Sequence, residues 1–177
     1  MNDNYAVKFG LMAGGGTVIF LCLFYWIDKV LILQPGVIWS TLILYLLGMY
    51  MAPLEVRKSQ DGIIDFKTAL RNAFLVWVIA NAIYHLFNYL LYNILDPEML
   101  EVQRNYMLDN FDKIEGILSR DNIETLKEGT NQLNYSFFTV LTHYASSLIG
   151  GFLFAAVIAR MIRREPISPQ NQENATN

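Results

Sequence analysis

The chain of 177 residues has few charged side chains, which make up 16% of the sequence, whereas an average soluble domain has about 25%. Its formal net charge is −3, so it lacks the excess of lysine and arginine that binding to nucleic acid requires. We therefore expect no nucleic-acid partner. Cys22 is the single cysteine, which excludes an intramolecular disulfide. Because Cys22 stands among apolar residues, we expect its thiol to be buried and unreactive.

Residue patterns that would carry catalysis or bind a metal are also missing. The chain has two histidines, His85 and His143, whereas a zinc site needs three or four ligands. Neither histidine belongs to an HExxH or a Ser-His-Asp pattern. The acidic residues between residues 96 and 134 do not have the spacing of a calcium-binding loop. The sequence thus predicts no metal, no cofactor and no enzymatic activity.

Hydrophobic residues dominate what is present, at 54% of the chain. Charged side chains are absent from four stretches of 19, 25, 24 and 31 residues, and a helix needs about 20 apolar residues to cross a bilayer. We predict four transmembrane helices, at about 7–27, 37–54, 68–95 and 136–162. The predicted fold class is therefore an all-α integral membrane protein, with residues 1–164 forming a four-transmembrane-helix bundle.

Lysine and arginine are unevenly distributed between the two sides of this bundle. Eight fall on the side of both chain ends, and five fall on the side of residues 96–134. Because basic residues are enriched in cytoplasmic loops, we expect both termini to be cytoplasmic and residues 96–134 to be extracytoplasmic. The polar residues 165–177 are expected to form a disordered cytoplasmic tail.

The extracytoplasmic segment 96–134 is predicted to be helical. Asp96 precedes Pro97, and such a pair is typical of a helix start, with the carboxylate as the cap. Apolar residues then recur every three or four positions, which predicts one apolar face on a helix. A second short helix is expected from Asp121 to about Gly129. This helical hairpin either rests on the membrane surface or the helix tops, or docks a second subunit or a partner protein.

Small residues recur every four positions in two of the predicted membrane helices. The first helix contains Gly10 and Gly14, and the last contains Ser147, Gly151, Ala155 and Ala159. Ridges of this kind let helix backbones approach closely. We expect the first and last helices to pack together, within one chain or between two. The alternative is a hinge or broken helix that lines a substrate site.

Polar side chains within the predicted membrane helices form one candidate cluster. Asn81, His85 and Asn88 share a face of the third helix, and His143 of the fourth helix is expected at a similar depth. Intramembrane polar residues usually face a bundle interior. The cluster is predicted to be a hydrogen-bond network, and a pocket that responds to protons or a ligand is the alternative.

Several short motifs resemble one protein family. They are the glycine cluster Gly10–Gly16, the run Ile64-Asp65-Phe66-Lys67-Thr68-Ala69-Leu70-Arg71, the run Ile94-Leu95-Asp96-Pro97-Glu98, and the run Ser146-Ser147-Leu148-Ile149-Gly150-Gly151 followed by basic residues. Together they resemble the domain of unknown function family 4199, which consists of small four-helix membrane proteins found mainly in Bacteroidetes. The resemblance covers about residues 5–164. It implies a bacterial inner-membrane protein with residues 96–134 in the periplasm, and it supplies no activity, cofactor or catalytic residue.

The expected function is a non-enzymatic helical bundle with a structural, accessory or regulatory role. Its expected partners are the lipid bilayer and either a second copy of the chain or another membrane protein. One alternative is an oligomeric small transporter or permeability factor that uses the face of Asn81, His85 and Asn88. A membrane enzyme that uses His85 and His143 as acid and base is the least favoured hypothesis.

Overall fold

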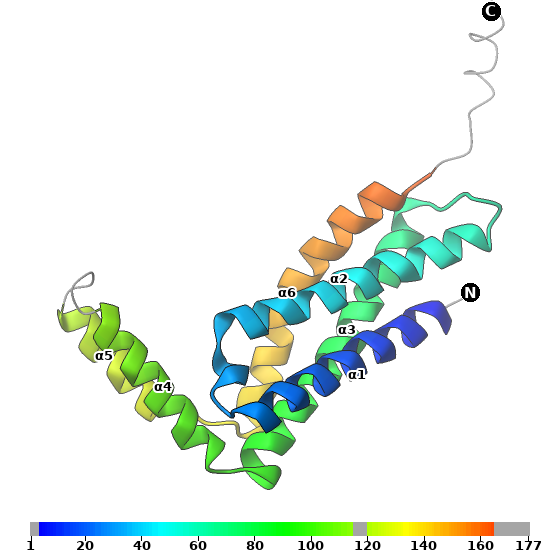
Figure 1. Cartoon of the computed structure of the whole chain (residues 1–177). Helices are drawn as coiled ribbons and strands as arrows, with labels where there is room; N and C mark the ends of the chain where they lie inside the picture. The colour runs from blue at the N-terminus through cyan, green and yellow to red at the C-terminus, as the bar shows by residue number, and fades with distance from the viewer. Residues whose placement is uncertain (1–3, 115–119, 165–177) are drawn as a thin grey trace, which may run out of the picture.

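A computed structural model describes residues 4–114 and 120–164 (Figure 1). Four long helices run alternately up and down: α1 (Asn4–Ile27), α2 (Pro35–Lys58), α3 (Phe66–Leu90) and α6 (Phe137–Ile162). All four are long and apolar enough to cross a membrane, which confirms the predicted all-α, four-span fold class. The tail predicted at residues 165–177 lies outside the described residues.

The observed helix ends differ slightly from the predicted ones. α2 begins at Pro35, because proline suits a first helical position, where the backbone N–H has no partner within the helix. It also continues past Leu54 to Lys58 and contains the buried Pro53. Membrane helices tolerate such prolines, since neighbouring groups can satisfy the freed carbonyl. α3 begins at Phe66, where the carboxylate of Asp65 accepts a hydrogen bond of 2.9 Å from the backbone N–H of Thr68.

The polar segment forms a helical hairpin of α4 (Met99–Ile114) and α5 (Arg120–Asn131). It leaves the bundle at the end opposite to the two chain ends and projects to one side (Figure 1). We call these two ends of the bundle the hairpin end and the termini end. The base of α4 packs on the ends of the membrane helices, where Met99 and Leu100 join a cluster with Leu91. The prediction that the hairpin rests on the helix tops therefore holds for this base only, because the rest of the hairpin extends sideways. Its position relative to a membrane surface stays a prediction.

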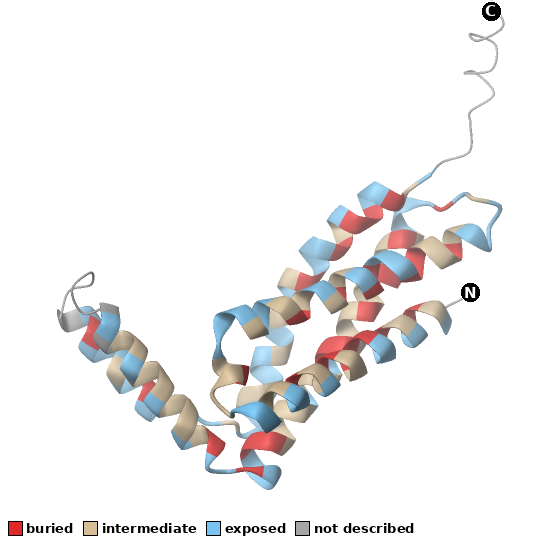
Figure 2. Cartoon of the chain, in the orientation of Figure 1, coloured by how far each residue is buried: buried red, intermediate tan, exposed pale blue. Residues whose placement is uncertain are grey.

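The third membrane helix, α3, forms the centre of the bundle. α1, α2 and α6 all pack against α3, and the most buried side chains lie along these contacts (Figure 2). Met49 of α2, Val76 of α3 and Ala155 of α6 belong to one buried cluster. Within one chain, the expected packing of the first helix on the last is therefore wrong, because each of them packs on α3 instead.

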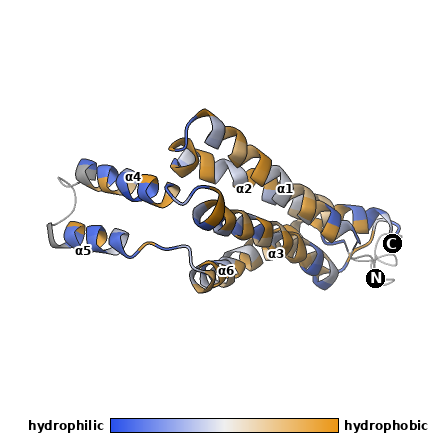
Figure 3. Ribbon diagram, turned by 90° about the horizontal axis from the view of Figure 1, so that it is seen from below, coloured by the Kyte–Doolittle hydropathy of each residue, from blue (hydrophilic) through white to orange (hydrophobic). Residues whose placement is uncertain are grey.

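The four long helices are mainly hydrophobic along their length (Figure 3), and many of their large apolar side chains are exposed. Ile19, Ile149 and Met161 are 65%, 70% and 70% exposed, which is the pattern of side chains that face lipid. Cys22 is exposed too, so the expectation that its thiol is buried is wrong. Cys22 lies on the same face of α1 as exposed residues such as Ile19. Its sequence neighbours are apolar, but in a membrane helix apolar residues face lipid as well as the core.

Candidate functional site

Asp96 stands at the junction between α3 and the hairpin, and it binds one residue from the last turn of α1 and one from the connection that follows α1. Its carboxylate accepts a hydrogen bond of 2.5 Å from the hydroxyl of Tyr25, and it forms an ion pair of 2.5 Å with Lys29. The Asp96 side chain is only 10% exposed. The Lys29 ammonium is the main reason why the pKa of Asp96 lies below its usual range, and the Tyr25 hydroxyl adds to this effect. The chain thus closes a long loop through one buried carboxylate.

The Asp96 carboxylate does more than the expected capping. α4 begins at Met99, whose N–H donates to the backbone oxygen of Asp96 at 3.0 Å. The carboxylate accepts from the backbone N–H of Glu98, just before the helix, and it also binds Tyr25 and Lys29. The ammonium of Lys29 is a stronger partner for a partly buried carboxylate than a backbone N–H is.

A second group of contacts connects the end of the third span, α4 and the segment that enters α6. The last turn of the third span, Leu91–Leu95, is a π-helix, a rare form that occurs mostly as a single turn within an α-helix. Tyr92 on this turn stacks on Tyr135, with ring centroids 3.7 Å apart. Asn93 donates to the backbone oxygen of Tyr135 at 2.8 Å, and the Tyr135 hydroxyl donates to Gln103 of α4 at 3.0 Å.

We call these contacts the neck, defined by Tyr25, Lys29, Tyr92, Asn93, Asp96, Gln103 and Tyr135. The neck holds both chain segments that connect the hairpin to the bundle. Asp96 anchors the segment that leaves α3, and Tyr135 anchors the segment that enters α6. A two-helix hairpin with both connections anchored is restricted in its direction.

The structure places the predicted polar residues at separate contacts. Asn81 is 5% exposed and donates a hydrogen bond to the hydroxyl of Ser147 on α6. Asn88 donates to the backbone oxygen of Tyr84 on its own helix, at 3.1 Å. The ring of His85 lies against that of Tyr144, with centroids 5.8 Å apart, whereas His143 is exposed.

The three predicted residues on α3 also line three different cavities. Asn81 borders a cavity of about 200 Å³ between α2 and α3, which we call the groove. Asn88 borders a more enclosed cavity of about 80 Å³ beneath the neck, which we call the chamber. His85 borders a cavity of about 250 Å³ between α3 and α6. Their shared helix face therefore does not line one continuous path in this chain.

The small-residue ridges lie where neighbouring helices approach α3. A Cβ atom at Gly14 would stand 2.9 Å from the Cα of Ala80 and 2.8 Å from a side-chain atom of Ile83. A Cβ atom at Gly151 would overlap the Trp77 ring. Gly10 meets Ile79 in the same way, and Ala155 and Ala159 are fully buried in the core.

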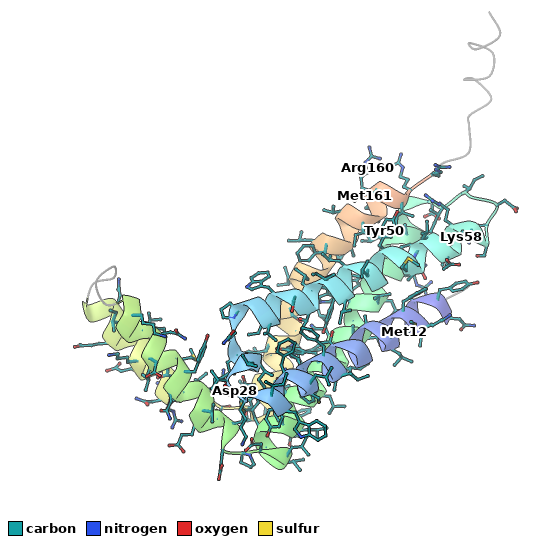
Figure 4. All side chains as sticks on the ribbon, in the orientation of Figure 1. Met12, Asp28, Tyr50, Lys58, Arg160 and Met161 are labelled. Carbon is teal, nitrogen blue, oxygen red and sulfur yellow. The ribbon has the colours of Figure 1, made fainter. Side chains whose placement is uncertain are left out.

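Basic side chains collect at the termini end, where the helices are tied together. Arg57 donates to the backbone oxygen of Ile162 at 3.2 Å, and the backbones of Ile64 and Arg164 pair at 3.0 Å in both directions. Lys58 and Arg160 lie at this end, and Asp28 lies at the hairpin end (Figure 4). These three charged residues lie at the ends of the bundle where the predicted four-span topology places them.

Most contacts of the neck are not predicted from the sequence. Lys29 follows the first span and Asp96 follows the third, so a four-span topology places both charges at the same end of the bundle. That coincidence is a usable signal for the ion pair, but stacking of Tyr92 on Tyr135 leaves no pattern in the sequence. Within residues 4–114 and 120–164, no group of three or more His, Cys, Asp or Glu side chains is arranged to hold a metal ion.

Comparison with known proteins identifies a family for this chain. The model of a family described as "Protein of unknown function (DUF4199)" matches residues 8–164. No curated protein and no solved structure matches the chain. Since the matched region includes all four spans and the hairpin, the chain belongs to the DUF4199 family, in agreement with the resemblance of its motifs.

Proposed function

We propose that this protein is a non-enzymatic accessory protein of the membrane, which presents its hairpin to a second protein. The neck is the observation that supports this proposal. A buried carboxylate, an ion pair and a stacked pair of tyrosines fix the two connections of a hairpin that otherwise extends away from the bundle. Ordering a segment in this way costs conformational entropy, and a fixed docking element gains from it because less ordering is left for the binding step.

The proposed location is a bacterial inner membrane, with both termini in the cytoplasm and residues 96–134 in the periplasm. The family's description supplies no location, so the charges support this part of the proposal. The basic residues gathered at the termini end favour a cytoplasmic position for that end. The hairpin then lies on the opposite side of the membrane.

The hairpin has surface to offer a partner because α4 and α5 cover mainly each other. Ile123 and Thr130 are buried between them, at 3% and 1% exposure, and Arg104 donates to the Thr130 backbone oxygen at 3.5 Å. Glu124 and Leu126 are exposed, and Leu126 is 40% exposed. The proposed partner is a second copy of the chain or another membrane protein.

We do not propose solute transport or catalysis. Asn81 and Asn88 line the adjoining groove and chamber, whereas His85 lines a cavity on the other side of α3, against α6, so the face that motivated a permeation path is divided in this chain. His85 and His143 are near enough to interact electrostatically, but only His85 lines the cavity between α3 and α6, and His143 is exposed.

Site-specific photo-crosslinking in living cells tests the proposal. A photoreactive amino acid placed at the exposed Glu124 is expected to yield one discrete adduct, whose mass identifies either a second copy or a different protein. The same amino acid at the lipid-facing Ile149, which is 70% exposed, is the control and is expected to yield lipid adducts. A hairpin position that gives no discrete protein adduct, at native expression levels, would contradict the docking role.

A further inference from the structure

The groove and the chamber adjoin each other. Both are lined by Ile38 and Thr41 of α2 and by Tyr84 of α3. They therefore form one amphipathic cavity that begins under the neck and continues along α2 and α3 towards the membrane interior. We propose that this cavity binds a membrane lipid with an uncharged, hydroxyl-bearing head group, of the monoacylglycerol or diacylglycerol type.

The groove has the properties of a site for an acyl chain. It is bordered mainly by apolar side chains, among them Ile38, Leu42 and Trp77. Trp39 stands at its edge with 69% of its surface exposed, which is the position of an interfacial anchor. At the hairpin end, α2 and α6 lie on opposite sides of α3 (Figure 3), so no fourth helix closes this side of the groove. A lipid chain can therefore enter it from the bilayer.

The chamber has the properties of a site for a small polar group without charge. Hydrogen-bonding side chains on its wall come from three helices and include Thr41, Asn88 and Gln103. No charged side chain is among the described residues that line either cavity. An amide has two donors and two acceptor lone pairs, and the bond from Asn88 to the Tyr84 backbone uses one donor. The Asn88 amide also bonds to the Tyr84 hydroxyl, and the positions that remain can serve a bound hydroxyl.

Size and charge exclude a phospholipid head group from the chamber. A cavity of about 80 Å³ holds only a few groups of the size of water. A buried phosphate requires cationic partners, and the nearby ammonium of Lys29 is paired with Asp96. A glycerol head group is small enough for the chamber and needs no cationic partner.

The depth of the two cavities matches the position of a lipid within one leaflet. Gln103 and Tyr135, at the base of the hairpin, border the chamber, so the chamber lies at the level where α3 leaves the membrane. The groove extends from there to Tyr45 and Trp77, which lie deeper in their spans. A lipid in this leaflet likewise has its head group at the membrane surface, level with the chamber, and its acyl chain deeper, level with the groove. This inference stands independently of the proposed docking role, because its test measures lipid and not protein partners.

Photo-labelling of the purified full-length protein in nanodiscs tests the site. The probe is a monoacylglycerol with a diazirine in its acyl chain. We expect saturable adducts on the groove-lining parts of α2 and α3, reduced at least tenfold by excess monooleoylglycerol. Leu42→Trp fills the groove and is expected to lower these adducts at least tenfold. The matched control is Ile43→Trp, on the 59% exposed neighbour, which is expected to change them less than twofold.

A second pair of variants tests the head-group assignment and does not depend on the folding of Leu42→Trp. Asn88→Leu removes a polar group from the chamber and is expected to weaken competition by monooleoylglycerol about fivefold, as for one lost hydrogen bond. Asn110→Leu removes an equivalent amide, which donates to the Tyr106 backbone on α4, and is expected to have no effect. Adducts that spread over the lipid-facing side of α1 without competition would overturn the site. If phosphatidylglycerol competed as well as monooleoylglycerol, the proposal that the site prefers an uncharged head group would be wrong. If glycerol alone competed, the proposal that the groove binds the acyl chain would be wrong.

Discussion

Gly150 and Gly151 are neighbours in sequence with opposite surroundings. A Cβ atom at Gly150 would meet nothing within 4 Å, whereas one at Gly151 would overlap the Trp77 ring. Packing in a membrane depends on such close approaches, because lipid provides no hydrophobic force that drives two helices together. The contact of Gly151 with Trp77 is therefore a main determinant of how α6 seats on α3.

Alanine substitutions at these two glycines are expected to differ in stability. Gly151→Ala has to displace a buried indole and is expected to lower the free energy of unfolding by about 1–3 kcal/mol, the usual cost of overpacking. Gly150→Ala is expected to be neutral, because its methyl group meets open space. Unfolding in mixed micelles, followed by circular dichroism, measures both. Equal stability of the two variants would contradict the packing.

Asp65 provides a second residue-scale prediction, at the start of α3. Asp65→Ala removes the cap on the Thr68 N–H and is expected to cost about 1 kcal/mol, whereas Asp65→Ser, which keeps a capping oxygen, is expected to cost less. The hydrogen bonds from Thr68 lower the pKa of Asp65. A carboxylate with a lowered pKa stabilises the fold above the pKa of the unfolded chain, about 3.9, and loses this effect as the pH falls further.

Unfolding measured from pH 7 to pH 2.5 tests this pH dependence. The stability advantage of the wild-type chain over Asp65→Ala is expected to be constant near neutral pH and to shrink in the acid range. The Asp65→Ser variant is the control, since a serine cap does not titrate. An advantage that grows towards low pH would have the wrong sign for a carboxylate cap.

At the scale of helices, the sequence predicts the spans well because a bilayer imposes a length and a low charge on each of them. It also locates the ridges at Gly10, Gly14 and Gly151, but it assigns them the wrong neighbour. A small residue shows that another backbone comes close and does not show which helix provides it. The sequence likewise finds two helices between residues 96 and 134. It indicates that Lys29 and Asp96 lie at the same end of the bundle, but the contact of Tyr25 with Asp96 has no signal in the sequence, because it depends on the packing of the complete bundle.

The neck yields the prediction at this scale. Asp96→Asn keeps the size of the side chain and removes its charge, so the ion pair with Lys29 is lost. We expect faster hydrogen exchange of the backbone amides at the first turn of α4. The control, Glu55→Gln, removes the exposed pair of Glu55 with Lys58 at the termini end and is expected to leave that exchange unchanged, since such surface pairs contribute little. Unchanged hydrogen exchange in Asp96→Asn would contradict the proposal that the ion pair of Asp96 anchors the hairpin.

For the molecule as a whole, the proposed topology places the hairpin and the loop between α2 and α3 on opposite sides of the membrane. A membrane-impermeant maleimide added to intact spheroplasts is expected to label Glu128→Cys and not Gln60→Cys, both in a Cys22→Ser background. Both positions are exposed, so only the membrane distinguishes them. Permeabilised cells provide the control, in which both cysteines react. The reverse pattern in intact spheroplasts would invert the proposed orientation.

The distance between the hairpin and the bundle provides the most direct test of the proposal that the neck holds a docking element in place. Spin labels on the native Cys22 of α1 and on Glu128→Cys of α5, in nanodiscs, allow this distance to be measured by pulsed electron paramagnetic resonance. A hairpin fixed by its neck is expected to give one narrow distance distribution, which Asp96→Asn broadens. A broad distance distribution in the protein with an intact neck would contradict the proposal that the neck holds the hairpin in place.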